Sequence, residues 1–362
     1  MRPIIGYEAA FTTRFGARAT LVREEGAALH REITPASAPL PPGMAGEESR
    51  VTPAAVIAFT EGPAVDADGS VFFSDIQNDR ILKLAPNGAL SEFRSAAGRA
   101  NGNLFDRAGR LVTCEGAEFG PGGRRRVTRT DLATGELTVL TEHFEGRRYN
   151  SPNDLAIDPQ GNIFFTDPLY NENFCTRELD VEAVYRIDPR GDVRRILSQP
   201  EIQKPNGIAV SPDGRTLYLV DSNPRPGGNR KIWSFQLDDS GTASAQRMVY
   251  DFGRGRGGDG LRLDMEGNLW VAAGINQPRG RPGETLDVPA GIYVISPRGE
   301  LLGRVPIPED TVTNLTFGPP DRKTLYVTAG KCLFRIPIHV SGYVIGPERS
   351  AASSAGGGSV ST

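Results

Sequence analysis

Residues 206–221 read NGIAVSPDGRTLYLVD, and the pattern of this stretch recurs along the chain. A polar first residue is followed by an apolar run, a turn, and a second run rich in β-branched and aromatic residues, as in a β-hairpin. The five other copies are EGPAVDADGSVFFSD from Glu61, NGNLFDRAGRLVTCE from Asn101, NDLAIDPQGNIFFTD from Asn153, DGLRLDMEGNLWVAA from Asp259 and NLTFGPPDRKTLYVTA from Asn314. The chain therefore contains six copies of one structural unit.

The spacing of the copies indicates what kind of repeat protein this is. Successive copies start 40, 52, 53, 53 and 55 residues apart, which is the period of β-propeller blades. The turn residue lies eight positions after the first residue of each copy. It is Gly in five copies, as a turn with positive φ favours, and Arg322 in the sixth.

Each copy continues with further strand-like runs, which in the fourth copy are TLYLVDS, KIWSFQL and RMVYDF. We therefore predict an all-β fold, a six-bladed β-propeller of four-stranded blades. The run AAVIAFT at 54–60 stands where an outermost strand belongs, so an N-terminal strand is expected to complete the sixth blade and close the ring.

Three regions follow from this reading. Residues 1–50 are expected to form a leading segment, partly irregular and rich in Pro near PASAPLPPG, and residues 51–346 are expected to form the propeller domain that carries any active site. Residues 347–362 are a low-complexity tail that is predicted to be disordered.

Composition excludes several partners. The net charge of -3 argues against nucleic acid, and no run of 18 apolar residues suggests a membrane span. The N-terminus lacks the pattern of a secretory signal, so a cytoplasmic location is expected. The widely spaced Cys114, Cys175 and Cys332 are interpreted as reduced structural thiols. The oligomeric state is left open.

The first residues of the six copies are all Asp, Glu or Asn: Glu61, Asn101, Asn153, Asn206, Asp259 and Asn314. Innermost strands of a propeller run in the same direction along the central channel, so these residues should converge on one mouth of it. Carboxylate and amide oxygens are ligands for hard cations, and two carboxylates balance one divalent ion. The alternative is that these residues cap strand ends and bind channel water.

At these positions the chain resembles the gluconolactonase and senescence-marker-protein family of metal-dependent six-bladed propellers. The resemblance covers about residues 55–340 and rests on EGP at Glu61, SPNDLAID around Asn153, PNGIAVSPDG around Asn206 and GDGLRLDMEGNLWVA around Asp259. It implies one divalent metal ion held by Glu61, Asn153, Asn206 and Asp259. Calcium is expected because the ligands are all oxygens, and zinc, manganese and magnesium also occur in the family.

The resemblance also implies an activity. Family members hydrolyse sugar lactones, and relatives such as diisopropyl fluorophosphatase cleave organophosphates. A small-molecule lactone is therefore the expected substrate, with the metal polarising its carbonyl and Asp259 acting as general base or as a ligand only. A phosphotriesterase-like or other carbonyl-substrate hydrolase, a non-enzymatic binding propeller and a metal-free strictosidine-synthase-like propeller are the alternatives.

Four further residues are candidates for contacts with the substrate or with the metal ligands. Asn101 and Asn314 are expected to contact the substrate or the outer shell of the metal. Asp154 either orients a ligand or water, or makes a structural hydrogen bond. The animal family members carry an Arg two residues before the counterpart of Asn153, where this chain has Ser151. Arg148 or Asn150 is the candidate substitute, and the alternative for Arg148 is a solvated loop residue.

Other catalytic patterns are missing. The sequence contains no G-x-S-x-G, and none of its three His lies near a ring position, which argues against a serine hydrolase. GRGRGG at 253–258 matches G-x-G-x-x-G, but no predicted helix follows it, so a dinucleotide site is not expected. We interpret it as a loop at the rim of the pocket.

Overall fold

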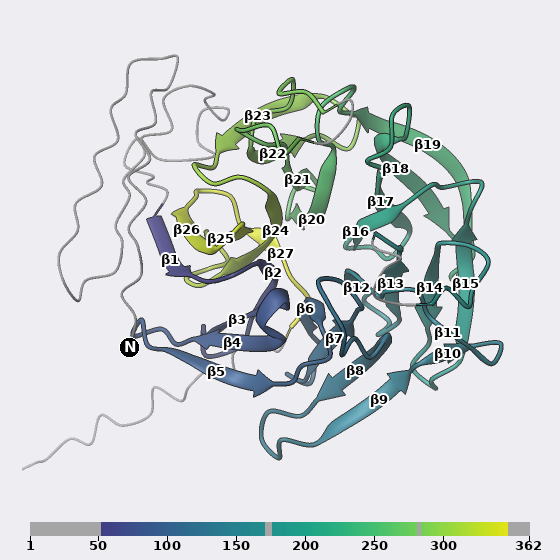
Figure 1. Ribbon diagram of the computed structural model, residues 1–362, viewed down its shortest axis with the longest axis horizontal. Helices are drawn as coiled ribbons and strands as arrows, with labels where there is room; N and C mark the ends of the chain where they lie inside the picture. The colour runs from purple at the N-terminus through teal and green to yellow at the C-terminus, as the bar shows by residue number, and fades with distance from the viewer. Residues whose placement is uncertain (1–51, 171–175, 281–283, 347–362) are drawn as a thin grey trace, which may run out of the picture.

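The computed structural model describes residues 52–170, 176–280 and 284–346. Its strands form six antiparallel blade sheets and one separate two-stranded hairpin, and the six blade sheets stand around a central axis as a propeller (Figure 1). The predicted six-bladed fold is confirmed. The segments 1–50 and 347–362, and Cys175, lie outside the described residues. Of the helices that the described residues form, none is long and apolar enough to cross a membrane.

The strands of each blade are given from the axis outward. Blade 1 contains β2 (Thr60–Val65), β3 (Val71–Asp75), β4 (Arg80–Leu84) and β5 (Leu90–Ser95), with the short 3-10 helix η1 (Ile76–Asn78) after β3. Blade 2 contains β6 (Ala100–Phe105), β7 (Leu111–Glu115), β8 (Arg126–Thr130) and β9 (Leu137–Thr141). The small hairpin β10 (His143–Phe144) and β11 (Arg147–Arg148) precedes blade 3, which contains β12 (Leu155–Ile157), β13 (Ile163–Asp167), β14 (Ala183–Ile187) and β15 (Val193–Ser198).

The second half of the ring follows the same order. Blade 4 contains β16 (Pro205–Val210), β17 (Thr216–Ser222), β18 (Arg230–Leu237) and β19 (Ala243–Asp251). Blade 5 contains β20 (Gly258–Asp264), β21 (Leu269–Ala273), β22 (Gly291–Ile295) and β23 (Leu301–Pro306). Blade 6 contains β24 (Val312–Gly318), β25 (Thr324–Ala329), β26 (Cys332–Pro337) and β1 (Thr52–Val56).

The start and end of the chain meet in blade 6. Strand β1 pairs antiparallel with β26, so the N-terminal strand completes the blade that the C-terminal copy begins. This closure is the predicted one. It joins elements far apart in sequence by backbone hydrogen bonds, which leaves no gap in the ring.

The hairpin turns follow the predicted chemistry. The glycines at the turn positions have positive φ, for example 89° at Gly69 and 87° at Gly161, and Arg322 in the sixth copy has a φ of 59°. In most of these turns, the side chain of an Asp residue accepts hydrogen bonds from backbone N–H groups of the same turn. The Oδ1 atom of Asp158 accepts the backbone N–H groups of Gln160 and Asn162 at 2.9 and 2.8 Å, and Asp66, Asp106 and Asp264 do the same.

The apolar core lies between the blades. At the boundary of blades 5 and 6, Trp270 packs edge-on against Phe317 with ring centroids 5.5 Å apart. Both rings are fully buried, as are the large side chains at the other boundaries. The burial of apolar side chains between neighbouring blades holds the ring together, and it places the innermost strands around the channel.

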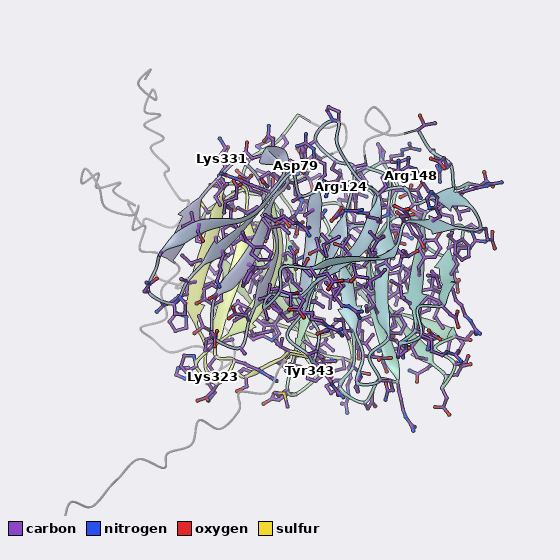
Figure 2. The ribbon with its side chains drawn as sticks, turned by 90° about the horizontal axis from the view of Figure 1, so that it is seen from below. Asp79, Arg124, Arg148, Lys323, Lys331 and Tyr343 are labelled. Atoms are coloured by element: carbon purple, nitrogen blue, oxygen red, sulfur yellow. The ribbon has the colours of Figure 1, made fainter. Side chains whose placement is uncertain are left out.

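Blade 5 departs from the predicted four strands. A fifth strand, β27 (Gly342–Tyr343), pairs with the C-terminal part of β20 on its axial side. Gly342 lies directly against the ring of Phe317, where a Cβ atom would have no room. Tyr343 is at the end of the molecule opposite Asp79, Arg124 and Arg148 (Figure 2). The last described segment therefore crosses one end of the channel, which no sequence pattern indicated.

Candidate metal centre

The six ring residues are all buried, with between 2% and 9% of their surface exposed. In five of the six innermost strands the pairing register shifts at the ring residue, as it does between Glu61 and Ala64 and between Gly258 and Leu261. A β-bulge redirects the side chain of the bulged residue, and bulges are common beside active sites. Asn153 is the exception, since it precedes β12 and bonds to Thr166 through its backbone.

Glycines let the ring residues approach one another. In four copies the residue after the ring residue is Gly, and it faces the next blade. A Cβ at Gly207 would lie 2.1 Å from the carbonyl oxygen of Asp259, and one at Gly62 would lie 2.1 Å from that of Asn101. The absence of side chains here sets the width of the channel mouth.

Gly207→Ala should therefore destabilise the protein by about 3 kcal/mol, because a backbone oxygen must move to accept the new methyl group. Urea unfolding measures this loss. Gly346→Ala is the matched control, since the space around Gly346 is open and its φ is not positive. An unchanged midpoint for Gly207→Ala would show that the mouth is not packed as described.

Acidic residues at the ends of second strands hold the loops that carry the ring. The carboxylate of Asp167 accepts the backbone N–H groups of Asn150 and Ser151 at 2.8 and 2.7 Å, just before Asn153. Burial raises the pKa of Asp167 to about 7, and these two donors oppose that rise. Asp221 accepts the N–H of Lys204 at 2.7 Å in the same way, just before Asn206.

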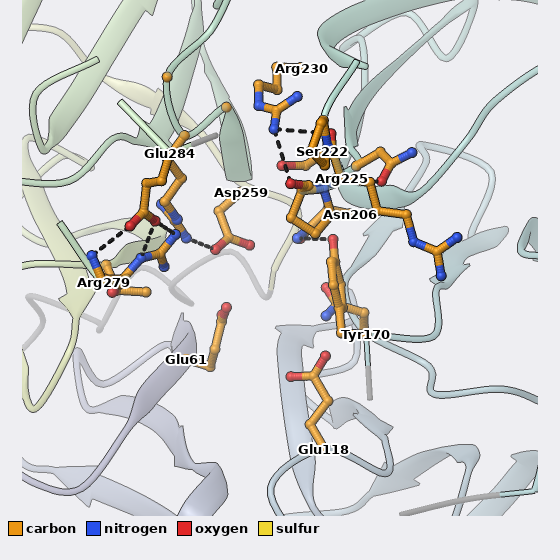
Figure 3. A pocket seen from close by; sticks show the side chains of 18 of the residues that line it. Glu61, Glu118, Tyr170, Asn206, Ser222, Arg225, Arg230, Asp259, Arg279 and Glu284 are labelled. Atoms are coloured by element: carbon orange, nitrogen blue, oxygen red, sulfur yellow. Dashed lines mark hydrogen bonds and ion pairs between the residues drawn. The ribbon is translucent and has the colours of Figure 1, made fainter. Parts of the chain in front are cut away.

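The four predicted metal ligands line one cavity of about 570 Å³ on the axis: Glu61, Asn153, Asn206 and Asp259. Figure 3 shows Glu61 and Asp259 pointing toward one another, with Asn206 and Tyr170 beside them. The amide of Asn206 donates to the Tyr170 hydroxyl at 2.8 Å. Two carboxylates and two amides from four different blades thus face the same space.

The other predicted site residues lie outside the cavity lining. Asn314 donates from Nδ2 to Glu61 at 3.2 Å and to Asp154 at 3.3 Å. Asn101 is buried, and its Oδ1 has no hydrogen-bond partner among the described residues. The guanidinium of Arg148 donates to the carbonyl of Arg124, and it does not line the cavity.

Asp154 forms an ion pair across the channel. Its carboxylate contacts Arg262 of β20 at 3.2 and 3.3 Å, and both side chains are buried. A buried charge of this kind is tolerated only when it is paired. Toward the end of the channel where Tyr343 lies, Arg262 and Tyr343 line a second, smaller cavity. The pair and β27 thus occupy the channel beneath the candidate ligands.

Sequence reasoning missed Arg256, which lines the cavity and pairs with Asp259. Its guanidinium also donates to the carbonyls of Gly274 and Val312, at 3.4 and 2.8 Å, which hold it in place. The only signal in the sequence was its position within GRGRGG, three residues before Asp259. That loop is at the rim of the cavity, as expected.

Negative charge is concentrated at the ring. Burial, together with the carboxylates of Asp259 and Asp154, raises the pKa of Glu61 well above its usual value. Burial also raises the pKa of Asp259, while Arg256 and a hydrogen bond from Asn206 oppose the rise. Burial and the carboxylates of Asp259 and Glu118 raise the pKa of Tyr170.

A divalent cation fits this arrangement. Its charge would relieve the repulsion felt by Glu61, and the available donors are oxygens of the kind that calcium binds. The described residues hold no cluster of three or more His, Cys, Asp and Glu side chains placed to bind a metal. The candidate centre depends on two carboxylates supplemented by the amides of Asn153 and Asn206.

The protein is thus a six-bladed propeller with an axial cavity lined by acidic and amide side chains. A family model described as SMP-30/Gluconolactonase/LRE-like region matches residues 59–331, and the chain belongs to this family. The gluconolactonase of Zymomonas mobilis is 29% identical over 313 residues, which are 79% of this chain and 81% of that protein.

Solved structures agree. A gluconolactonase from Xanthomonas campestris is 30% identical, with a TM-score of 0.71 and coverage of 88% of this chain and 100% of that chain. Regucalcin from Agrobacterium tumefaciens, described as a calcium-binding protein, is 20% identical with a TM-score of 0.64, covering 81% of this chain and 95% of that chain. This last likeness concerns the fold.

Proposed function

We propose that this protein is a metal-dependent lactonase that opens lactones to hydroxy acids in the axial cavity. Its family and its gluconolactonase relatives make it a hydrolase of the lactonase class. The metal dependence and the residue roles are our proposal. The observation that carries it is that Glu61, Asn153, Asn206 and Asp259, from four blades, line one cavity.

These four side chains would hold one divalent ion, for which calcium is our first candidate because every donor is an oxygen. When bound, such an ion polarises a carbonyl and stabilises the negative charge that develops on its oxygen. Glu61 and Asp259 supply the two carboxylates, of which Asp259 is also paired with Arg256, and the amide oxygens of Asn153 and Asn206 complete the set. Asn314, which donates to Glu61, would keep that carboxylate oriented.

Asp259 is our candidate for the general base. It would take a proton from the water that attacks the lactone carbonyl carbon, the bond from that carbon to the ring oxygen would break, and the ring oxygen would receive a proton. A base must be ionised to act, and the pairing of Asp259 with Arg256 favours its carboxylate form. The carbonyls that fix Arg256 also fix the position of this carboxylate.

Titration of released acid across aldonolactones, simple γ-lactones and paraoxon tests the reaction. We expect turnover of the lactones and little or none of paraoxon, because the relatives named above are gluconolactonases. A preference for paraoxon would instead favour the phosphotriesterase alternative. Failure to hydrolyse any lactone would contradict the proposal.

A further inference from the structure

The cavity has a cationic wall that the proposed reaction does not use. Five arginines and four acidic residues are among its lining: Arg225, Arg230, Arg254, Arg256 and Arg279, with Glu61, Glu118, Asp259 and Glu284. Two of the arginines are neutralised within the cavity. Arg256 pairs with Asp259, and Arg279 pairs with Glu284 at 2.7 Å.

The other three arginines have no carboxylate partner among the described residues. Arg230 donates to the carbonyls of Gly228 and Pro224 at 2.8 and 3.1 Å, so its charge is held in place but not neutralised. The guanidinium groups of Arg225 and Arg254 make no hydrogen bond or ion pair with any described residue and are exposed to solvent. Three positive charges therefore face the cavity.

These arginines come from two neighbouring segments that pack against each other. Arg225 belongs to the connection from β17 to β18, Arg230 is the first residue of β18, and Arg254 belongs to the loop before β20. A Cβ at Gly257 would lie 2.9 Å from the Cβ of Arg230, so the glycine allows this close approach. In GRGRGG, Gly255 and Gly257 thus pack against Val288 and Arg230, while Arg254 and Arg256 lie beside the cavity.

The cavity is asymmetric as a result. Figure 3 shows Arg225 and Arg230 on the side away from Glu61 and Glu118. Phe59 and Phe119 add an aromatic pair to the lining, with ring centroids 4.7 Å apart. A ligand that reaches the axis from the mouth would meet cations along one wall only.

We propose that Arg225, Arg230 and Arg254 form a subsite for an anionic substituent, so that the preferred substrate is a lactone with a carboxylate, phosphate or sulfonate group remote from its carbonyl. This inference rests on the proposed lactonase function. Guanidinium groups bind such anions through paired, charge-assisted hydrogen bonds. The anion would pair with Arg225 and Arg254, whose guanidinium groups have no partner among the described residues, and would direct the lactone carbonyl toward the axis.

The test compares glucono-1,5-lactone with its 6-phosphate and with a lactone of glucaric acid, whose remote group is a carboxylate. Wild-type enzyme should show at least about tenfold higher kcat/KM for one or both charged lactones, a preference that weakens as salt screens the charges. The doubly substituted Arg225→Gln, Arg254→Gln enzyme should lose about tenfold of this preference. The control Arg190→Gln removes one positive charge by the same substitution at an exposed hairpin of blade 3, and it should keep the preference for charged lactones.

Equilibrium binding tests the anion subsite independently of lactone hydrolysis. Calorimetry should show 6-phosphogluconate binding more tightly than gluconate, and the double variant should abolish the difference. Equal values for the two ligands, with equal kcat/KM for neutral and charged lactones, would overturn the subsite. Loss of all lactone hydrolysis with the binding difference retained would overturn the proposed function and leave the subsite standing.

Discussion

Replacing Asp259 by Asn should lower kcat/KM for a lactone by about 10² to 10⁴, the usual cost of losing a general base. The amide keeps the shape of the side chain and one oxygen donor, so the fold should survive. It loses the negative charge and the ability to accept a proton from water. It also ends the ion pair with Arg256, which remains held by the carbonyls of Gly274 and Val312.

Metal content must be measured in the same samples, because a weakened site would lower the rate by itself. Asn101→Ala is the matched control. Asn101 is a ring residue that does not line the cavity, and this variant should retain most of its metal. If Asp259→Asn turned over normally with full metal, Asp259 would be neither the base nor a critical charge. The proton acceptor would then have to be sought at Glu61 or Asp154.

Removing the metal with a chelator should reduce lactone hydrolysis to background, and adding calcium back should restore it. Elemental analysis should find one divalent ion per chain. The ion should also stabilise the fold, since a ligand at 100 times its Kd adds about 2.7 kcal/mol to the free energy of unfolding. Thermal unfolding with and without calcium measures this effect without reference to activity.

The substitution Glu61→Gln tests the same metal centre. It removes one of the two carboxylates in the proposed set and should weaken metal binding by at least about 100-fold, the upper range for loss of an outer partner. Full activity in the chelated enzyme, or far less than one ion per chain after metals are added, would contradict the metal centre. Zinc or manganese at one per chain would change only the identity of the ion.

The six-bladed fold could be predicted from the repeats in the sequence. Six copies with a turn at a fixed position specify blades, because hairpin formation depends on neighbouring residues and their alternation. The run before Glu61 was also enough to predict that β1 closes the ring. The segment at Gly342 and Tyr343 carried no repeat signal, and its pairing with β20 depends on packing against residues such as Phe317.

Repeat symmetry also predicted which residues would gather at the channel mouth. It could not separate the four that line the cavity from Asn101 and Asn314, because the six positions are equivalent in the pattern. The bulges and the contacts of each side chain decide this, and both depend on the neighbouring blades. Arg148 shows the same limit, since its contact with Arg124 directs it to another loop.

The residues that surround the ring could be identified only from the folded chain. The pairing of Asp154 with Arg262 joins residues that are 108 positions apart in the sequence, and the cationic wall combines segments from blade 4 and from the loop that leads into blade 5. Neither contact follows a period along the chain, so no local pattern encodes it. The blade repeats can be recognised in the sequence because each blade must form the same hairpins. The lining of the cavity depends instead on where the closed ring brings unlike loops together.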